Sequence, residues 1–290
     1  MAGEDRGGRH TREEMLQAAK ASPEAVAGHD KQAWTGLFAK RAIVEDPVGS
    51  TPSRCVIDEK TGKRDISQLE KFYDTFIAPN NIAFNVYRDI VAENVVVRDL
   101  DIMIESSTGL RTTLHSYIFY EFIEEEGRLK ISRLAAYWEL AGMIRQVLLR
   151  GWPGIKMMAV LGMRMLRVQG LSGVWGYMRG LGGVGRRGKE RVQEFSRALN
   201  DRDAGSIVRL FHPGSGVVEF PANGGPVSPG SLLDLVSGSF SVSDPISSGS
   251  STGFRFDASM EGISRQGIGL FEFTDRGRLI ERARLFWEDF

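Results

Sequence analysis

The hydrophobic and polar positions of the chain follow the same order twice. One stretch runs from about residue 13 to 140, and the other from about residue 189 to the C-terminus. Each begins with apolar residues at helical spacing, over 14–20 and over 192–199. A polar turn and a second short helix that ends in Leu-Phe follow in both. The pattern therefore predicts two helices at the start of each stretch.

Both stretches end in patterns typical of strands. Residues 120–122 (Tyr-Glu-Phe) precede a Gly turn and then 137–139 (Tyr-Trp-Glu), and residues 271–273 (Phe-Glu-Phe) precede a Gly turn and then 286–288 (Phe-Trp-Glu). Such alternation around a turn predicts a β-hairpin with one buried face. Further strand candidates lie at 85–90, 95–105, 112–122, 253–259 and 263–274.

Helices first and antiparallel strands afterwards is an α+β order. A length of 290 residues suggests two domains. We divide the chain into a disordered tail (1–12), a first domain (13–140), a basic Met-rich helical connector (141–188) and a degenerate second domain (189–290). The Gly-, Ser- and Pro-rich residues 222–252 are expected to be irregular.

The first stretch resembles a known family. Leu-Phe at 37–38, Ile-Val-Glu-Asp-Pro-Val-Gly-Ser at 43–50 and Leu-Glu-Lys-Phe-Tyr at 69–73 resemble the corresponding runs of bacterial ketosteroid isomerases. These belong to the wider SnoaL-like, nuclear-transport-factor-2-like family. The resemblance spans nearly all of 13–140 and is weaker in the second stretch. It implies two cone-shaped domains, each with three helices packed on a curved antiparallel sheet around an apolar pocket.

The resemblance assigns catalysis to Asp46, which would move a proton α to a steroid ketone. A carboxylate at the mouth of an apolar pocket has a raised pKa, which suits a general base. The oxyanion donors of the family are missing, because its first-helix tyrosine falls on Ser22 and its protonated aspartate on Ile118 or Phe119. Loss of one such donor lowers a rate by ~10²–10³.

Substitutes for those donors are His115 and Tyr117, which share one face of the predicted strand 112–122 with Phe119. If that face lines the pocket, the pair supplies a donor and a second acid or base; if it is the outer face, both are ordinary sheet residues. The candidate ligand-binding residues are aromatic: Trp34, Phe38, Phe72, Tyr73, Phe119 and Tyr137. Tyr73 and Tyr137 equally fit core positions.

The epoxide hydrolase/cyclase branch of the family gives an alternative, which needs a second acid. Asp99, Asp101 and Glu105 lie on one face of the predicted strand and are candidates for this second acid. They equally fit a face of the strand that is exposed to solvent. In the second stretch Phe220 stands where the first has Asp46, so we expect its catalytic role to be lost. Lipid binding, packing on the first domain and homodimer formation all remain open for it.

The charges are unevenly distributed although they sum to zero. The chain has 37 Lys+Arg and 37 Asp+Glu, yet between Glu139 and Glu190 it has basic residues and no acidic one. A basic segment rich in Met, Leu and Trp is typical of a helix on anionic lipid, and equally of a linker folded onto the domains. Its longest uncharged run, 168–178, is shorter than the ~20 residues that span a bilayer.

The leading hypothesis is a protein that binds and isomerises a steroid-like or polyketide-like apolar ligand, as a steroid Δ-isomerase with a divergent oxyanion hole. The alternatives are a non-catalytic lipid-binding or membrane-associated interaction protein, and an epoxide hydrolase/cyclase. The Gly-rich run 180–185 lacks the βαβ context of a nucleotide loop. The Met and Trp residues of the connector are not interleaved with Arg as stacking platforms, so we expect no nucleic acid. We also expect no cofactor and no metal. The polar N-terminus and the single cysteine, Cys55, predict a cytoplasmic protein, with peripheral membrane contact through 141–188.

Overall fold

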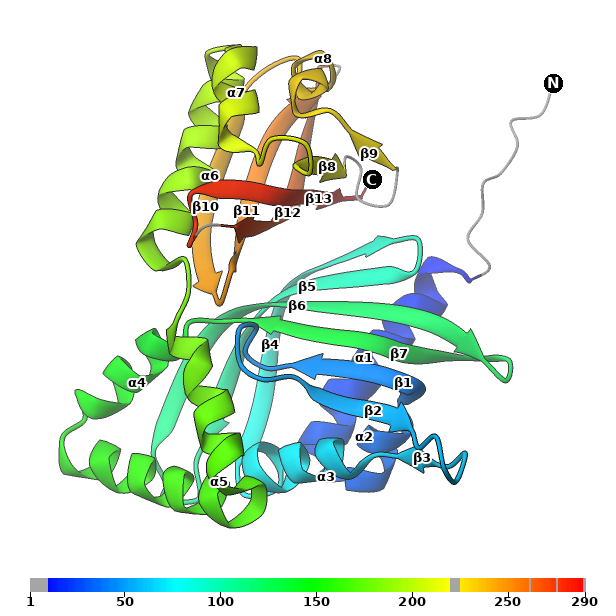
Figure 1. The fold of residues 1–290 in the computed structure, drawn as a ribbon, viewed down its shortest axis with the longest axis vertical. Coiled ribbons are helices and arrows are strands. Elements are labelled where there is room, and N and C mark those ends of the chain that lie inside the picture. The colour runs from blue at the N-terminus through cyan, green and yellow to red at the C-terminus, as the bar shows by residue number, and fades with distance from the viewer. Residues whose placement is uncertain (1–9, 220–224, 261, 275, 289–290) are drawn as a thin grey trace.

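The structure is a computed structural model that describes residues 10–219, 225–260, 262–274 and 276–288. It contains two β-sheets that are each accompanied by helices, with a helical connector beside the first (Figure 1). This architecture confirms the predicted α+β class with two sheets. Most of the predicted tail, residues 1–9, lies outside the described residues, whereas Thr11 already caps the first helix.

The first sheet has seven strands in the order β3-β2-β1-β7-β6-β5-β4. All neighbours are antiparallel except β1 and β7, which are parallel. The strands are β1 (Phe38–Glu45), β2 (Ser53–Ile57), β3 (Arg64–Asp65), β4 (Asn81–Ala92), β5 (Val95–Glu105), β6 (Arg111–Glu125) and β7 (Arg128–Tyr137). The associated helices are α1 (Arg12–Ala27), α2 (Lys31–Gly36), α3 (Ser67–Phe72) and the π-helical turn η1 (Tyr73–Ile77).

The second sheet has six strands in the order β10-β11-β12-β13-β8-β9. Read from its other end, this is the order β2-β1-β7-β6-β5-β4 of the first sheet, and its parallel pair, β13 and β8, has the same place as β7 and β1. The strands are β8 (Val217–Glu219), β9 (Pro226–Val227), β10 (Phe240–Ser248), β11 (Ser251–Met260), β12 (Ile263–Thr274) and β13 (Leu279–Trp287). The helices are α6 (Gly185–Asn200), α7 (Ala204–Leu210), the 3-10 turn η3 (Pro229–Ser231) and α8 (Leu232–Leu235).

The turns between the first two helices of each half are built in the same way. His29 and Arg202 both have a φ of 53°, and the residue after each, Asp30 or Asp203, caps the following helix. A side-chain oxygen at this position satisfies a backbone N–H that the first helical turn leaves free. The polar turns in the sequence therefore predicted both helix starts for a physical reason.

The expectation that residues 222–252 are irregular is wrong where they are described. Phe240–Ser248 forms the regular strand β10, which pairs with β11 along its length around one register shift. Phe240 and Ile246 are buried in this strand, and serines occupy many of the remaining positions. Two buried apolar anchors are enough to hold a Ser-rich edge strand on the sheet. Residues 222–224 lie outside the described residues.

The connector forms α4 (Leu140–Leu148), α5 (Trp152–Met178) and the 3-10 turn η2 (Arg179–Leu181). It packs on the first sheet and its helices, as one of the two interpretations of its sequence predicted. Among its glycines, Gly170 interrupts α5 with a φ of 73°. Gly176 instead permits close packing, since a Cβ there would lie 2.7 Å from Thr51 Oγ1. No helix in the described part of the chain is both long and apolar enough to cross a bilayer.

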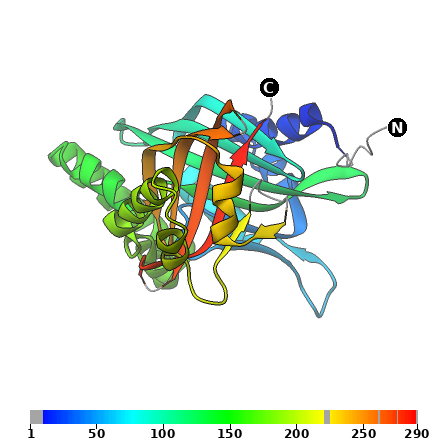
Figure 2. The same ribbon diagram turned by 90° about the horizontal axis from the view of Figure 1, so that it is seen from above.

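The two sheets pack against each other through the faces that turn away from their helices (Figures 1 and 2). Apolar residues of both sheets form the contact, including Tyr117, Phe119 and Phe286. Within this interface the buried carboxylate of Asp99 forms an ion pair with Arg255. Gly49 and Gly249 meet backbone to backbone, so that a Cβ on Gly49 would lie 2.3 Å from the Cα of Gly249. The interface is therefore both apolar and closely fitted.

Candidate functional site

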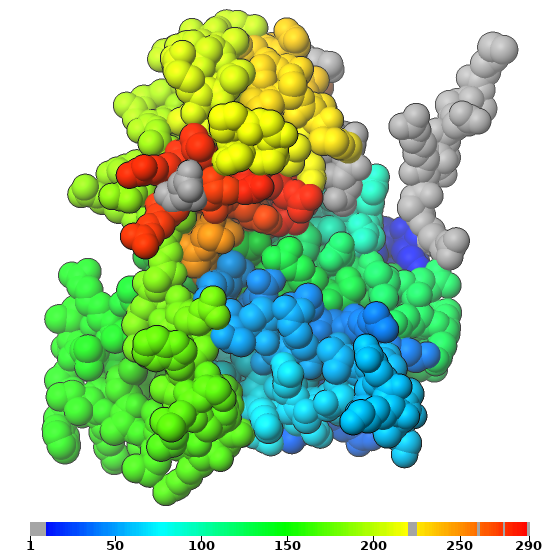
Figure 3. Space-filling model, in the orientation of Figure 1, coloured from blue at the N-terminus to red at the C-terminus, as the bar shows by residue number. Residues whose placement is uncertain are grey.

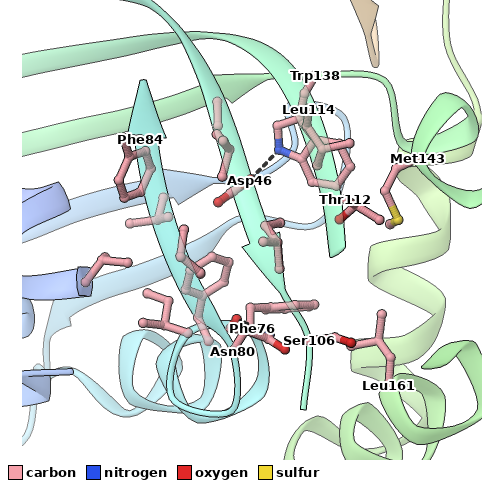
Figure 4. Close-up of a pocket in the computed structure, with 18 of the residues that line it drawn as sticks. Asp46, Phe76, Asn80, Phe84, Ser106, Thr112, Leu114, Trp138, Met143 and Leu161 are labelled. Atoms are coloured by element: carbon pink, nitrogen blue, oxygen red, sulfur yellow. Dashed lines mark hydrogen bonds between the residues drawn. The ribbon is translucent and has the colours of Figure 1, made fainter. Parts of the chain in front are cut away.

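A cavity of about 140 Å³ lies between the first sheet, its helices and the connector. Its walls are mostly apolar, and they include residues from α3 and η1, from β4 to β7, and from α4 and α5 (Figure 4). Asp46 is the carboxylate among the lining residues. The pattern is that of a pocket for an apolar molecule with one reactive or anchoring polar group.

Asp46 follows directly after β1, and the alternation of the strand decides where it points. Val44 and Asp46 face the cavity, whereas Glu45 faces the other way and forms an ion pair with Arg133, with Nε to Oε2 at 2.8 Å. The indole Nε1 of Trp138 donates a hydrogen bond to Asp46 Oδ1 at 2.6 Å. Burial raises the pKa of Asp46 to about 6, and the Trp138 hydrogen bond opposes this rise.

Trp138 comes from the strand that pairs with β1. In β7 and the residue that follows it, Leu134, Ala136 and Trp138 line the cavity, whereas Ala135 and Tyr137 lie in the contact with the second sheet. The sequence analysis treated Trp138 only as part of a hairpin. Trp138 could have been recognised as a cavity residue because it lies on the same face of the strand as the apolar residues 134 and 136.

Two tyrosine hydroxyls lie near Asp46. Tyr120 of β6 and Ser22 of α1 both line the cavity, and the Ser22 side chain is close enough to lower the pKa of Tyr120. Tyr177 of α5 lines it too. Burial raises the pKa of both tyrosines, and the charge of Asp46 adds to this rise. For Tyr120 the charge of Arg98 opposes the rise. A tyrosine hydroxyl from β6 thus reaches the position in α1 where the family resemblance expected a tyrosine.

The structure corrects the prediction for His115 and Tyr117. The cavity-facing residues of β6 are the even-numbered Thr112, Leu114, Ile118 and Tyr120, so the odd-numbered ones point to the second sheet. The His115 ring lies beside Asp101, with Nδ1 to Oδ1 at 3.1 Å, and the Tyr117 hydroxyl donates to Asp244 O at 3.0 Å. Neither side chain lies with Asp46 in the cavity.

The six predicted ligand-binding aromatics divide into three groups. Trp34 and Phe72 line the cavity. Phe38 and Tyr73 pack behind Trp34, with ring centroids 4.7 and 5.7 Å from it, and are core residues. Phe119 and Tyr137 belong to the contact between the sheets, so assigning them to the pocket was wrong. Phe76 and Phe84 are cavity residues that the sequence analysis missed.

The acidic residues considered for epoxide opening also lie outside the cavity. Asp99 and Asp101 share the outward parity of β5 with Glu105, whereas Ile102 and Ile104 face inward. Asp99 is not solvated as the alternative interpretation expected, because it is buried against Arg255. Phe220 lies outside the described residues. In the described part of the chain, no three His, Cys, Asp or Glu side chains gather to hold a metal ion.

The end of the cavity formed by the β5–β6 turn carries polar groups, which include the guanidinium of Arg164. Thr112 is 5% exposed, and its Oγ1 has no hydrogen-bond partner within the described residues. Ser106 and Asn80 line the same cavity (Figure 4). Arg164 of α5 donates to Ser107 Oγ at 2.9 Å and thereby ties the connector to the β5–β6 turn. A ligand acceptor at this end would satisfy the Thr112 hydroxyl.

No protein-family model matches this chain, and no curated protein matches it. Among solved structures it is similar to the Delta 5-3-ketosteroid isomerase from Mycobacterium sp., with 25% identity over 44% of this chain and 94% of that chain, at a TM-score of 0.37. A Mycobacterium tuberculosis protein in complex with estradiol-17beta-hemisuccinate matches with 22% identity over 44% and 95%, at a TM-score of 0.36. An epoxide hydrolase of M. tuberculosis matches with 13% identity over 51% and 95%, at a TM-score of 0.37.

Proposed function

We propose that the cavity binds an apolar, steroid-like or polyketide-like ketone and that Asp46 transfers a proton within it. The observation that carries this proposal is a carboxylate with a pKa of about 6 among apolar walls, oriented by the Trp138 indole. A base with such a pKa is mostly ionised at neutral pH and is still basic enough to accept a proton. The result of the reaction is an isomer of the ligand.

The reaction has two proton transfers. Asp46 takes the proton from the carbon next to the carbonyl, which breaks the C–H bond and leaves a dienolate when the ligand is a β,γ-unsaturated ketone. The protonated Asp46 then returns the proton to a carbon further along the conjugated system. The dienolate oxygen needs a hydrogen-bond donor, and we assign this role to the hydroxyl of Tyr120.

A second candidate function is binding without chemistry, as a carrier of the same apolar ligand. It is favoured by the loss of the tyrosine and the protonated aspartate that the family resemblance expected, whose positions fall on Ser22 and on Ile118 or Phe119. Epoxide hydrolysis is less well supported, since that route needs a second acid to protonate the epoxide, and Asp99 and Asp101 lie outside the cavity.

The test follows the conjugated-enone absorbance of a Δ5-3-ketosteroid in the presence of the protein. We expect Asp46→Asn to lower kcat by ~10²–10⁴ and Tyr120→Phe to lower it by ~10²–10³. Tyr117→Phe is the matched control, because it removes a hydroxyl from the same strand on the other face. We expect it to leave turnover unchanged.

Two outcomes would contradict the catalytic proposal. One is the absence of turnover by the wild type, and the other is equal turnover by wild type and Asp46→Asn. Steroid binding is measured in the same samples through the fluorescence of Trp34 and Trp138, which both line the cavity. Binding without turnover would support the carrier instead.

A further inference from the structure

The outer surface of the connector exposes an unusual number of large apolar side chains. Of the 18 that are exposed in the described residues, ten lie between positions 148 and 181. Trp152, Leu171 and Trp175 are 74%, 79% and 76% exposed. We call the most exposed of the set the connector face: Leu149, Trp152, Ile155, Met163, Leu171 and Trp175. A cluster of this kind marks an interaction surface, whereas single exposed apolar residues need no explanation.

The two sides of α5 have different tasks. Trp152, Ile155 and Met163 recur at helical spacing on its exposed side. Met157 and Leu161 lie on its other side and line the cavity. The connector is therefore a single layer of helix between the cavity and the outside, and in Figure 3 its green atoms form a lobe beside the first domain.

The charge of the connector has one sign. It contains no acidic residue between Glu139 and Glu190. Five of its cations are exposed and form no ion pair with a described carboxylate: Arg145, Arg150, Lys156, Arg167 and Arg179. Lys156 and Arg167 both lie along one edge of the apolar stripe of α5 on the helical wheel. Cations beside exposed Trp and Leu suit a surface that is negative outside and apolar beneath.

We propose that the connector face docks the protein on an anionic lipid bilayer, with the cavity directly behind the docked helix. A lipid-dissolved ligand would then pass between bilayer and cavity past α5. A second copy of the chain fits less well, because two connectors face to face would bring together cations of the same sign. The route of the ligand rests on the proposed function, whereas the docking does not.

The test is co-sedimentation of the full chain with vesicles of equal parts phosphatidylcholine and phosphatidylserine, and with vesicles of phosphatidylcholine alone. We expect binding to the anionic vesicles that weakens as salt rises from about 0.1 M to about 1 M. The triple variant Trp152→Ser, Leu171→Ser and Trp175→Ser should bind these vesicles at least roughly tenfold more weakly than the wild type. Lys156→Gln with Arg167→Gln should weaken binding to the anionic vesicles selectively.

The matched control is Val208→Ser with Leu235→Ser and Ile263→Ser, which removes exposed apolar residues outside the connector. It should bind like the wild type. The proposal is overturned if the wild type does not sediment with anionic vesicles, if the control loses binding equally, or if the triple variant only abolishes self-association. Asp46→Asn should still bind vesicles, and the triple variant should still turn over dissolved steroid. Failure of docking and failure of catalysis are therefore distinguishable.

Discussion

The two sheets share a strand order, yet the first encloses a cavity and the second is filled with phenylalanine rings. In the second half Phe195 of α6 meets Phe271 of β12 at a ring-centroid distance of 5.0 Å, and Phe254 of β11 meets the same ring at 4.9 Å. All three are fully buried. In the first half, the helices and sheet leave space beside Asp46 instead. The same strand order can therefore enclose a cavity or a fully packed core, depending on the side chains between the sheet and its helices.

Glycines on one strand make the filling of the second half possible. A Cβ on Gly269 of β12 would lie 2.2 Å from the Phe254 ring, and one on Gly267 would lie 2.3 Å from the Phe256 ring. The rings therefore lie directly on the strand. In the first sheet β6 has the corresponding place in the strand order, and it presents Leu114, Ile118 and Tyr120 to the cavity.

The second half of the chain contacts the first half next to Asp46 and Trp138. The hydroxyl of Ser248, at the β10–β11 turn, contacts Val48 O at 2.9 Å and Trp138 O at 3.1 Å. Val48 lies two residues after Asp46, and Trp138 donates a hydrogen bond to the Asp46 carboxylate. Ser248 of the second half therefore contacts both segments that carry the carboxylate and its partner.

The largest expected effect comes from hollowing the filled half. Phe254→Ala should lower the free energy of unfolding by about 3–5 kcal/mol, because it leaves a cavity among closely packed rings. Leu114→Ala in the cavity wall should lower it by less than about 2 kcal/mol, since this side chain already borders empty space. Urea denaturation of both variants measures the difference. Equal losses would show that the two halves are packed alike.

The next effect has the opposite sign and concerns the hollow half. The pKa of Asp46 rises from an ordinary value of 3.8 to about 6, so the folded protein holds this proton more tightly than the unfolded chain. The wild type therefore loses stability as pH rises from about 4 to about 6, and Asp46→Asn, which does not titrate, avoids that loss.

Asp46→Asn should consequently raise the free energy of unfolding at pH 7, by up to about 3 kcal/mol. The gain should disappear at about pH 3, where both states of the wild type are largely protonated. Denaturation of both proteins at the two pH values tests this. A gain that is the same at both pH values would mean that the amide acts through packing and that the carboxylate is not desolvated.

Most strands of the two sheets were predictable from the sequence, whereas β10 and the inner face of the central strand β6 were not. The predicted strands 95–105 and 263–274 coincide with β5 and β12 because their apolar runs end at turn residues. In β6, however, residues 116–120 are all buried, since one face meets the cavity and helices and the other meets the second sheet. Alternation identifies an inner face only where the other face is exposed. His115 and Tyr117 were misplaced for this reason.

Asp46 itself was found through a family resemblance carried by a local motif. Its partners were not, because Trp138, Tyr120 and Tyr177 come from three other segments that only the fold brings together. The connector illustrates the same limit. Its composition fitted a lipid-facing helix and a folded linker equally, and in the structure its inner side packs on the first domain while its outer side remains exposed.

The smallest expected effect concerns a single hydroxyl in the cavity wall. Thr112 Oγ1 is buried and has no hydrogen-bond partner among the residues that the structure describes, so Thr112→Val should raise the free energy of unfolding by about 1 kcal/mol. Thr75→Val is the matched control, because Thr75 Oγ1 donates to Lys71 O at 2.7 Å and accepts from Gln169 Nε2 at 2.9 Å. It should destabilise by about 1–2 kcal/mol. If Thr112→Val destabilises as well, its hydroxyl is satisfied by water in solution. If Thr112→Val stabilises the protein but weakens steroid binding, the unsatisfied Thr112 hydroxyl of the first half serves as a hydrogen-bond donor to the ligand. In the described part of the second half, side chains fill the corresponding space, so such a donor has no room to act there.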